Sequence, residues 1–270
     1  MKSNGSIKIY SFYYKVQSTI QLHEHYFPIW VGKNGQPENS IFLGDDTGEN
    51  ISDKNEYYSE LTGLYWVWKN TKSEIVGSCH YRRYFTFPEE PLIYRIKRLL
   101  YYPAGLWKKR FGLIYTKNYK FWTPNILPEK EIKQLLSSFD IILPTRRILR
   151  QSIRQHYQKY HNPNDLILLK NILDESFPEY LNSFENVLDD NRLFANNMFI
   201  MEWKRFNKMM NWLFFILFKF EEKCDLQSYE GYQKRIFGFL SERLITLWVV
   251  HNNLNYKELP LIYFKKLKNN

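Results

Sequence analysis

The sequence predicts an α/β fold: a single domain, residues 1–270, with a mixed, mostly parallel sheet and a helical C-terminal part. Residues 75–79 (IVGSC) and 140–143 (DIIL) form short β-prone runs with almost no charge, as expected of strands in a sheet covered on both faces. Helical patterns lie between such runs. With 270 residues and 44% hydrophobic content, the chain can bury one sizeable core and is too short for two.

The first third of the chain alternates between strand and helix patterns. Residues 7–14 (IKIYSFYY) and 28–31 (PIWV) predict two strands. Residues 55–70 carry large apolar side chains at helical spacing, and Asn55 is a suitable N-cap. Glu60 lies near the start of this helix, where its carboxylate can reach a neighbouring cleft.

An acidic loop, residues 44–52 (GDDTGENIS), precedes that helix. Its glycines let a ligand approach the backbone closely. The adjacent carboxylates of Asp45 and Asp46, next to Thr47, suit a divalent ion or the hydroxyls of a sugar. No Gly-Lys-Ser/Thr follows, so the loop is not a P-loop. The alternative interpretation is a solvated turn.

The most distinctive motif directly follows the strand at residues 75–79. His80, Tyr81, Arg82 and Arg83 place an imidazole, a phenol and two guanidinium groups at its carboxyl end, where open α/β sheets bind ligands. Arginine forks match phosphate oxygens and can stabilise the charge on a departing diphosphate. The alternative is that the arginines pair with a neighbouring acidic helix and the tyrosine is simply packed.

A second strand end repeats this pattern. Residues 140–143 are followed by Pro144 and then by Arg146 and Arg147, so both strand ends can share one phosphate-bearing ligand. Further along, His156 and His161 lie five residues apart, which does not place them on one helical face as a metal pair requires.

The C-terminal part is predicted to be mainly helical. Residues 197–201 (NMFIM) read as a buried strand, and residues 203–223 as a long core helix. A last helix, residues 232–253, carries Glu242 beside its apolar face. Residues 257–264 (KELPLIYF) predict an edge strand that contains Pro260.

The positive charge of the chain is local. The formal net charge is +10, and residues 92–120 contain eight basic and no acidic residues. Their mixture with aromatic and aliphatic side chains suits an anionic membrane surface, whereas a basic insertion packed on the domain is the alternative. The two cysteines have no metal-ligand spacing and the N-terminal sequence has no apolar signal region, which together favour a cytosolic protein.

Several motifs together resemble one family. GDDTGENIS, YYSELTGLYWVWKN, GSCHYRRYF, FDIILP, NMFIM, GFLSERL and KELP are similar, in order and spacing, to a bacterial family of capsular and exopolysaccharide biosynthesis proteins. That family is often labelled only as a domain of unknown function, and some members are glycosyltransferases, including galactofuranose transferases. The resemblance runs from Ile7 to Pro260 and leaves residues 92–120 as an insertion.

The resemblance implies a Rossmann-like, GT-A-like fold and an inverting hexosyltransferase. The donor would be a nucleotide-sugar, in particular a UDP-sugar, with UDP-galactofuranose as the narrower candidate. The acceptor would be a lipid-linked or growing surface saccharide at the inner face of the cytoplasmic membrane. No nucleic-acid partner is expected.

The resemblance also distributes roles among the candidate residues. Glu242 would be the catalytic base, with Asp45 and Asp46 in reserve. The donor-binding residues would be His80, Tyr81, Arg82, Arg83, Thr47, Glu60, Arg146 and Arg147. The acceptor-binding residues would be His156, Tyr157, His161 and Asn197. We expect no metal, because no Asp-x-Asp follows the central strand, although Mg²⁺ or Mn²⁺ at the Asp45–Asp46 pair stays an alternative.

Two other functions are compatible with the sequence. A non-catalytic module that binds nucleic acid or another anionic polymer would use the basic aromatic segment, residues 92–120. A scaffold of the polysaccharide machinery would bind a nucleotide without turnover.

Overall fold

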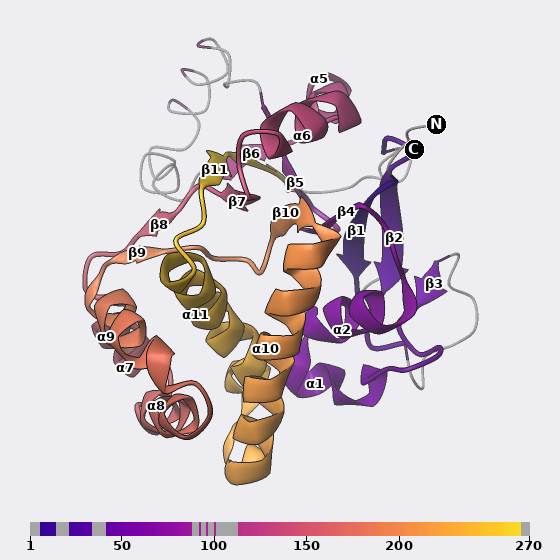
Figure 1. Ribbon diagram of the computed structural model, residues 1–270. Helices are drawn as coiled ribbons and strands as arrows, with labels where there is room; N and C mark the ends of the chain where they lie inside the picture. The colour runs from indigo at the N-terminus through magenta and orange to yellow at the C-terminus, as the bar shows by residue number, and fades with distance from the viewer. Residues whose placement is uncertain are drawn as a thin grey trace.

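The computed structural model describes residues 6–14, 22–33, 42–87 and 113–265, together with the single positions 92, 96 and 100. A mixed sheet crosses the molecule, with helices packed against it (Figure 1). This confirms the α/β prediction. No helix in the described part of the chain is both long enough and apolar enough to cross a membrane.

The strands form one ten-stranded sheet and one small ribbon in the described residues. The strands are β1 (Ile7–Tyr13), β2 (Tyr26–Trp30), β3 (Leu43–Gly44), β4 (Ile75–His80), β5 (Arg83–Phe85), β6 (Leu113–Thr116), β7 (Ile141–Pro144), β8 (Arg147–Ile148), β9 (Arg192–Leu193), β10 (Phe199–Glu202), β11 (Tyr256–Leu259) and β12 (Leu261–Phe264). The main order is β11-β7-β10-β4-β1-β2-β3, and β8 pairs with β9 in the ribbon. A branch of β5, β12 and β6 continues from β4.

The helices lie between these strands. The α-helices are α1 (Asn55–Tyr58), α2 (Leu61–Asn70), α5 (Tyr119–Trp122), α6 (Glu129–Leu136), α7 (Ile153–Tyr160), α8 (Asn164–Ser176), α9 (Leu181–Asp189), α10 (Trp203–Lys223) and α11 (Ile236–His251). The 3-10 helices are η1 (Ser52–Lys54), η3 (Thr123–Asn125), η4 (Pro178–Tyr180), η5 (Leu226–Ser228) and η6 (Gly231–Arg235). The long helix α10 begins and ends where the sequence predicts.

Strand direction brings several chain segments to one edge of the sheet. The strands β3, β2, β1 and β4 are parallel neighbours, and β7 is parallel to β11. The strand β10 runs antiparallel to both β4 and β7. The residues that precede β10 therefore lie beside the carboxyl ends of β4 and β7, which is where ligands of α/β sheets bind.

Two hydrophobic clusters cover the two faces of the sheet. Along β1, Tyr10 and Phe12 belong to one cluster and Ile9 to the other, and Phe199 and Ile200 divide in the same way along β10. This alternation follows from the two-residue period of a strand. The first cluster packs against α2, α8, α9, α10 and α11, and the second against α5 and α6. The prediction of strands buried on both sides is confirmed.

The helix predicted over residues 55–70 is divided in two. Ser59 has φ 52°, a left-handed conformation that ends α1 before α2 begins. Asn55 is not the predicted N-cap, because its side-chain amide donates to the Ser59 carbonyl and the Thr62 hydroxyl. The break places Glu60 at the entry to α2, with its side chain 11% exposed.

The C-terminal strand pattern also differs from the prediction. Residues 257–264 belong to two strands separated by Pro260, and only β11 lies at the end of the main strand order. The strand β12 is internal, since it pairs with β5 on one side and β6 on the other.

Because β6 and α5 lie within residues 113–122, the last part of the predicted insertion belongs to the folded domain. Apart from positions 92, 96 and 100, the remainder of the insertion, residues 93–112, lies outside the described residues.

Candidate functional site

A pocket of about 620 Å³ lies at the carboxyl edge of the sheet. Side chains reach it from β1, the turn after β4, the ribbon strand β8, the break before α2 and the first turns of α11. Its charged lining residues are Arg82, Arg83, Arg147, Arg235, Glu56, Glu60 and Glu242. We call this the sheet-edge pocket. Its lining residues are distant in the sequence and include residues that follow both predicted strand ends.

The HYRRY motif forms a tight turn that connects β4 to the antiparallel strand β5. His80 at the end of β4 pairs antiparallel with Arg83 at the start of β5, which leaves Tyr81 and Arg82 in the turn. All four residues line the sheet-edge pocket. The Arg83 guanidinium lies 5.4 Å from the centre of the Tyr263 ring and forms no ion pair with a carboxylate in the described part of the chain.

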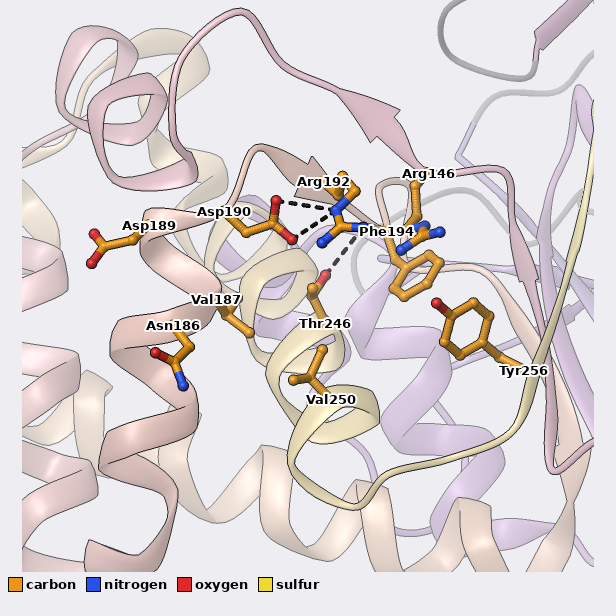
Figure 2. A pocket seen from close by; sticks show the side chains of 10 residues that line it. All are labelled: Arg146, Asn186, Val187, Asp189, Asp190, Arg192, Phe194, Thr246, Val250 and Tyr256. Carbon is orange, nitrogen blue, oxygen red and sulfur yellow. Dashed lines mark hydrogen bonds and ion pairs between the residues drawn. The ribbon is translucent and has the colours of Figure 1, made fainter.

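The two arginines after β7 point to opposite sides of the ribbon. Arg147 lines the sheet-edge pocket, whereas Arg146 lines a second pocket and forms an ion pair with Glu258 at 2.5 Å. Figure 2 shows Arg146 beside Phe194 and Tyr256 in that second pocket. Successive residues of an extended chain face opposite ways. The structure therefore brings Arg147 to the same pocket as the HYRRY motif, as the prediction of a site shared by the two strand ends requires, and leaves Arg146 outside that pocket.

A buried polar network fixes one wall of the sheet-edge pocket. Glu60 accepts a hydrogen bond from the Asn197 amide at 2.8 Å and pairs with Arg235 at 3.2 Å. Asn197 also donates to the Gly238 carbonyl and accepts from the Ser241 hydroxyl. Burial raises the pKa of Glu60, but the neighbouring His80, followed by Arg235 and the Asn197 hydrogen bond, outweighs it and holds the pKa below its usual value. Glu60 therefore stays ionised in the pocket.

Glu242 lies in the same pocket on α11. Its Oε1 accepts the backbone N–H of Asn196 at 2.7 Å, and its Oε2 is 3.2 Å from Nη1 of Arg243. Arg243 is 3% exposed and rests over the Tyr157 ring. The sequence places Glu242 and Arg243 beside the core face of the helix, and the structure shows that the arginine belongs to the core while the glutamate faces the pocket.

The pocket carries more positive than negative charge. Each of its three glutamates pairs with a cation: Glu56 with Lys234, Glu60 with Arg235 and Glu242 with Arg243. The residues that line the pocket comprise four arginines and three glutamates. Such a surplus in a partly enclosed site attracts an anionic ligand.

His80 does not contribute to this positive charge. Burial, with smaller effects from Arg83 and Arg235, lowers the pKa of its imidazole to about 4, although Glu60 acts in the opposite direction. Its Nε2 lies 2.6 Å from the Asn196 carbonyl oxygen, so the neutral ring donates its N–H there. At neutral pH His80 therefore adds no positive charge for a diphosphate, and its hydrogen bond connects the end of β4 to the segment before β10.

Lowering the pH from 7 to 5 is expected to destabilise the fold through His80. Its pKa in the folded chain lies below the value of about 6.5 in the unfolded chain, so the unfolded state takes up a proton first. The stability is complete above about pH 6.5 and is lost toward pH 4, by up to about 1.4 kcal/mol per pH unit. Urea denaturation at pH 7, 6 and 5 measures the free energy of unfolding. This free energy should fall less steeply with decreasing pH in His80→Gln than in the wild type. The control is His23→Gln, and equal slopes in both variants would contradict the assignment.

The acidic loop is a structural element outside the sheet-edge pocket. Asp45 is fully buried and accepts hydrogen bonds from the backbone N–H groups of Gly32 and Lys33 and from the hydroxyls of Ser52 and Thr62. With both of its oxygens engaged in this way, Asp45 does not fit the role of a metal ligand or base.

The other two loop residues are also outside the pocket. Asp46 lies 3.8 Å from the Lys33 ammonium, and Thr47 accepts a hydrogen bond from the Trp66 indole. Neither lines the sheet-edge pocket. Nowhere in the described part of the chain do three or more His, Cys, Asp or Glu side chains converge as metal ligands do.

Asp45→Ala is expected to lower the free energy of unfolding by about 3 kcal/mol or more, because it leaves several buried donors without an acceptor. Urea denaturation measures the loss. Asp46→Ala, which removes a partly exposed carboxylate from the same loop, is the matched control and should cost less than about 1 kcal/mol. A similar small loss for both variants would mean that the buried network contributes little.

The residues expected to bind the acceptor lie beside the sheet-edge pocket but do not line it. Tyr157 is fully buried and donates to Asp165 at 2.7 Å. His161 is bonded to Gln233 at 2.8 Å and packs on Phe239. His156 is partly buried, and burial, followed by Arg243 and Arg147, lowers its pKa to about 4. The burial of Tyr157 leaves no exposed surface for an acceptor, and the Asn197 side chain donates to Glu60 and to the Gly238 carbonyl.

Several pocket residues were not predicted. Arg235, Asn196, Ser59, Tyr232 and Phe239 all line the sheet-edge pocket. Arg235 directly precedes the apolar run of α11, so a cation at a helix start was a signal available in the sequence. Asn196 has φ 80° and Asn197 φ 50°, and two adjacent asparagines are suited to that backbone conformation.

Comparisons with known proteins agree with this architecture. No curated protein matches the chain. Among solved structures, the chain is similar to the apo structure of the WbbM bifunctional glycosyltransferase, with a TM-score of 0.83 and 27% sequence identity. The likeness covers 97% of this chain and 46% of the other, so the chain spans a little under half the length of that protein.

The family comparison covers most of the chain. Residues 8–253 match the sequence profile described as "Domain of unknown function (DUF4422)". This match spans the HYRRY turn, the buried acidic loop and the Glu242 helix, and it confirms the inferred resemblance to a family labelled as a domain of unknown function. The chain therefore belongs to the DUF4422 family.

Proposed function

We propose that the chain is a glycosyltransferase that moves a sugar from a nucleotide-sugar donor to a saccharide acceptor. The observation that carries this proposal is one pocket in which the arginine-rich turn after β4 and the carboxylate of Glu242 face the same space. The similarity of the whole chain to part of a bifunctional glycosyltransferase supports it.

The donor diphosphate is assigned to the turn and the ribbon. Arg82 and Arg83 come from the carboxyl end of the sheet, and Arg147 comes from β8. One guanidinium group can donate hydrogen bonds to two phosphate oxygens at once. Its positive charge stabilises the negative charge that develops as the diphosphate leaves. The reaction is proposed to need no metal, and the donor to be a UDP-sugar, with UDP-galactofuranose as the specific candidate.

Glu242 is assigned as the base. In a single displacement, its carboxylate takes the proton of an acceptor hydroxyl while that oxygen bonds to the anomeric carbon of the donor. The bond from the anomeric carbon to the diphosphate breaks, and the nucleoside diphosphate leaves with the electron pair. Such a displacement inverts the configuration of the anomeric carbon.

The first test is thermal stabilisation of the full chain by UDP, GDP, CMP and dTDP, each with EDTA and with Mn²⁺. A ligand that binds the folded state raises its apparent stability. A shift with UDP in EDTA supports the donor class and the metal-free arginine site. A shift only with Mn²⁺ contradicts the metal-free site, and no shift with any nucleotide contradicts the proposed function.

The acceptor is proposed to be a lipid-linked saccharide at the inner face of the cytoplasmic membrane. The support is the sequence of residues 92–120, whose cations each contribute about 1 kcal/mol near an anionic surface. Cosedimentation should then occur with anionic vesicles and be weak with zwitterionic ones, whereas equal binding to both would contradict this part.

A further inference from the structure

The second pocket, about 560 Å³ in volume, lies on the other side of the β8–β9 ribbon. It is lined by Arg146, Arg192 and Phe194 from the ribbon and its ends, by Thr246 and Val250 from α11, and by Tyr256 from β11. Residues of α9, among them Asn186, complete the opposite side (Figure 2). We call this the ribbon pocket. Apart from Arg146, which was predicted to bind the donor, its lining residues have no role in the sequence motifs or in the proposed chemistry.

The two pockets share a wall at three independent places. Arg146 lines the ribbon pocket and Arg147 the sheet-edge pocket. In the segment between β9 and β10, Phe194 lines the ribbon pocket and Asn196 the sheet-edge pocket. On α11, Thr246 lines the ribbon pocket and Glu242 the sheet-edge pocket. Thr246 and Glu242 are one helical turn apart, about 6 Å along the axis. The ribbon pocket therefore begins about one turn from the proposed base.

The ribbon pocket differs from the sheet-edge pocket in its charge. Its four charged lining residues all take part in ion pairs. Arg146 pairs with Glu258, Arg192 with Asp190, and Asp189 with Arg154. In the described structure no surplus of either sign remains among them, so this pocket does not favour a phosphate or another ion.

Its remaining groups suit a neutral ligand rich in hydroxyls. The Arg146 guanidinium lies 5.7 Å from the Phe194 ring centre and 5.4 Å from that of Tyr256, which gives a flat, partly apolar surface. The Tyr256 hydroxyl and the exposed Asn186 amide form no hydrogen bond with another described residue. Aromatic side chains together with a few placed polar groups are typical of concave pockets that bind small molecules.

We propose that the ribbon pocket is a subsite for the acceptor saccharide, which binds sugar units beyond the one that reacts. The inference rests on the proposed function, because it takes the reacting hydroxyl to lie near Glu242. A chain of two or more sugars then extends past the shared wall, with its further units against Tyr256 and Arg146. The substrate class is accordingly an oligosaccharide or a longer glycan, and a single sugar uses only part of the site.

The test measures binding of linear galactose-, glucose- and mannose-containing oligosaccharides, one to six units long, to the full chain in the presence of UDP. Val250→Trp fills the ribbon pocket from an exposed position of α11 without removing a polar contact. Tyr256→Ala removes the ring and the hydroxyl. Ile167→Trp makes the same kind of change at an exposed position of α8 that lines neither pocket, and it is the matched control.

The wild type and Ile167→Trp are expected to bind tri- and longer saccharides more tightly than single sugars. Val250→Trp should lose this dependence on length. Tyr256→Ala should weaken binding of the longer saccharides about two- to tenfold. UDP stabilisation should be unchanged in all variants.

Equal length dependence in Val250→Trp and Ile167→Trp would overturn the subsite. So would the absence of saccharide binding in a wild-type protein that UDP stabilises. Failure of the proposed function gives a different result, because UDP then causes no thermal shift. If saccharides still bind in that case and Val250→Trp abolishes this binding, the ribbon pocket remains supported as a saccharide site.

Discussion

Glu242→Gln is expected to lower the rate of sugar transfer by about 10²- to 10⁴-fold while UDP still stabilises the protein. The amide has nearly the shape of the carboxylate but cannot accept the proton of an acceptor hydroxyl, and general bases contribute about this factor. The glutamine oxygen can keep the hydrogen bond from the Asn196 N–H, which Glu242 accepts at 2.7 Å. The pocket should therefore retain its shape.

The substitution has a second effect that the experiment must separate. Arg243 is 3% exposed and pairs with Glu242, so the variant leaves a buried guanidinium without its carboxylate. The free energy of unfolding should fall, by about 1 to 3 kcal/mol given that Glu242 is partly exposed. Transfer rates are therefore compared at a temperature where urea denaturation shows both proteins to be folded.

Glu221→Gln is the matched control for the Glu242 variant. Glu221 is a partly buried carboxylate on α10 that accepts from Lys54 and Tyr58, and it lines neither pocket. Its loss should lower stability but leave the transfer rate within about twofold of the wild type. If Glu242→Gln itself keeps its rate within tenfold of the wild type, another group is the base.

The sequence predicts the local parts of this site. The strand before His80 is recognisable because five adjacent small or apolar residues lack charge, and HYRRY is conspicuous because it reverses that composition at once. The long helix α10 can also be predicted from neighbouring residues alone, because its helical pattern continues without Gly or Pro. Features that depend only on neighbouring residues can therefore be predicted from the sequence.

The other features depend on pairing and burial, which a single sequence does not contain. Arg146 and Arg147 look equivalent, and only the pairing of β8 with β9 decides which one faces the sheet-edge pocket. Asp45 and Asp46 look like a ligand pair, yet Asp45 turns inward to accept hydrogen bonds from buried donors. His80 looks cationic beside two arginines, but burial keeps its ring neutral.

Arg83→Ala is expected to weaken UDP binding about 10²-fold. The Arg83 side chain lines the sheet-edge pocket and makes no ion pair with a carboxylate in the described structure, so its charge is available to a ligand. Hydrogen bonds between charged groups contribute about 1.5 to 3 kcal/mol each, and a bidentate contact uses two. Isothermal titration with UDP in EDTA measures the loss.

Arg205→Ala controls for the removal of an arginine. Arg205 lies on α10, pairs with Asp140 and Glu202, and lines neither pocket. Its loss should leave the dissociation constant for UDP unchanged. UDP binding to Arg83→Ala with wild-type affinity would show that the diphosphate does not contact this turn.

Arg83→Lys separates charge from geometry. Lysine keeps the positive charge but lacks the planar fork, so it should recover only part of the affinity if two phosphate oxygens are held at once. Full recovery by lysine would indicate a general electrostatic role. If Arg83 only packs against Tyr263, both substitutions should lower stability and leave UDP affinity unchanged. A partial recovery would therefore argue that the turn after β4 recognises the shape of a diphosphate, which a surface that merely attracts anions does not require.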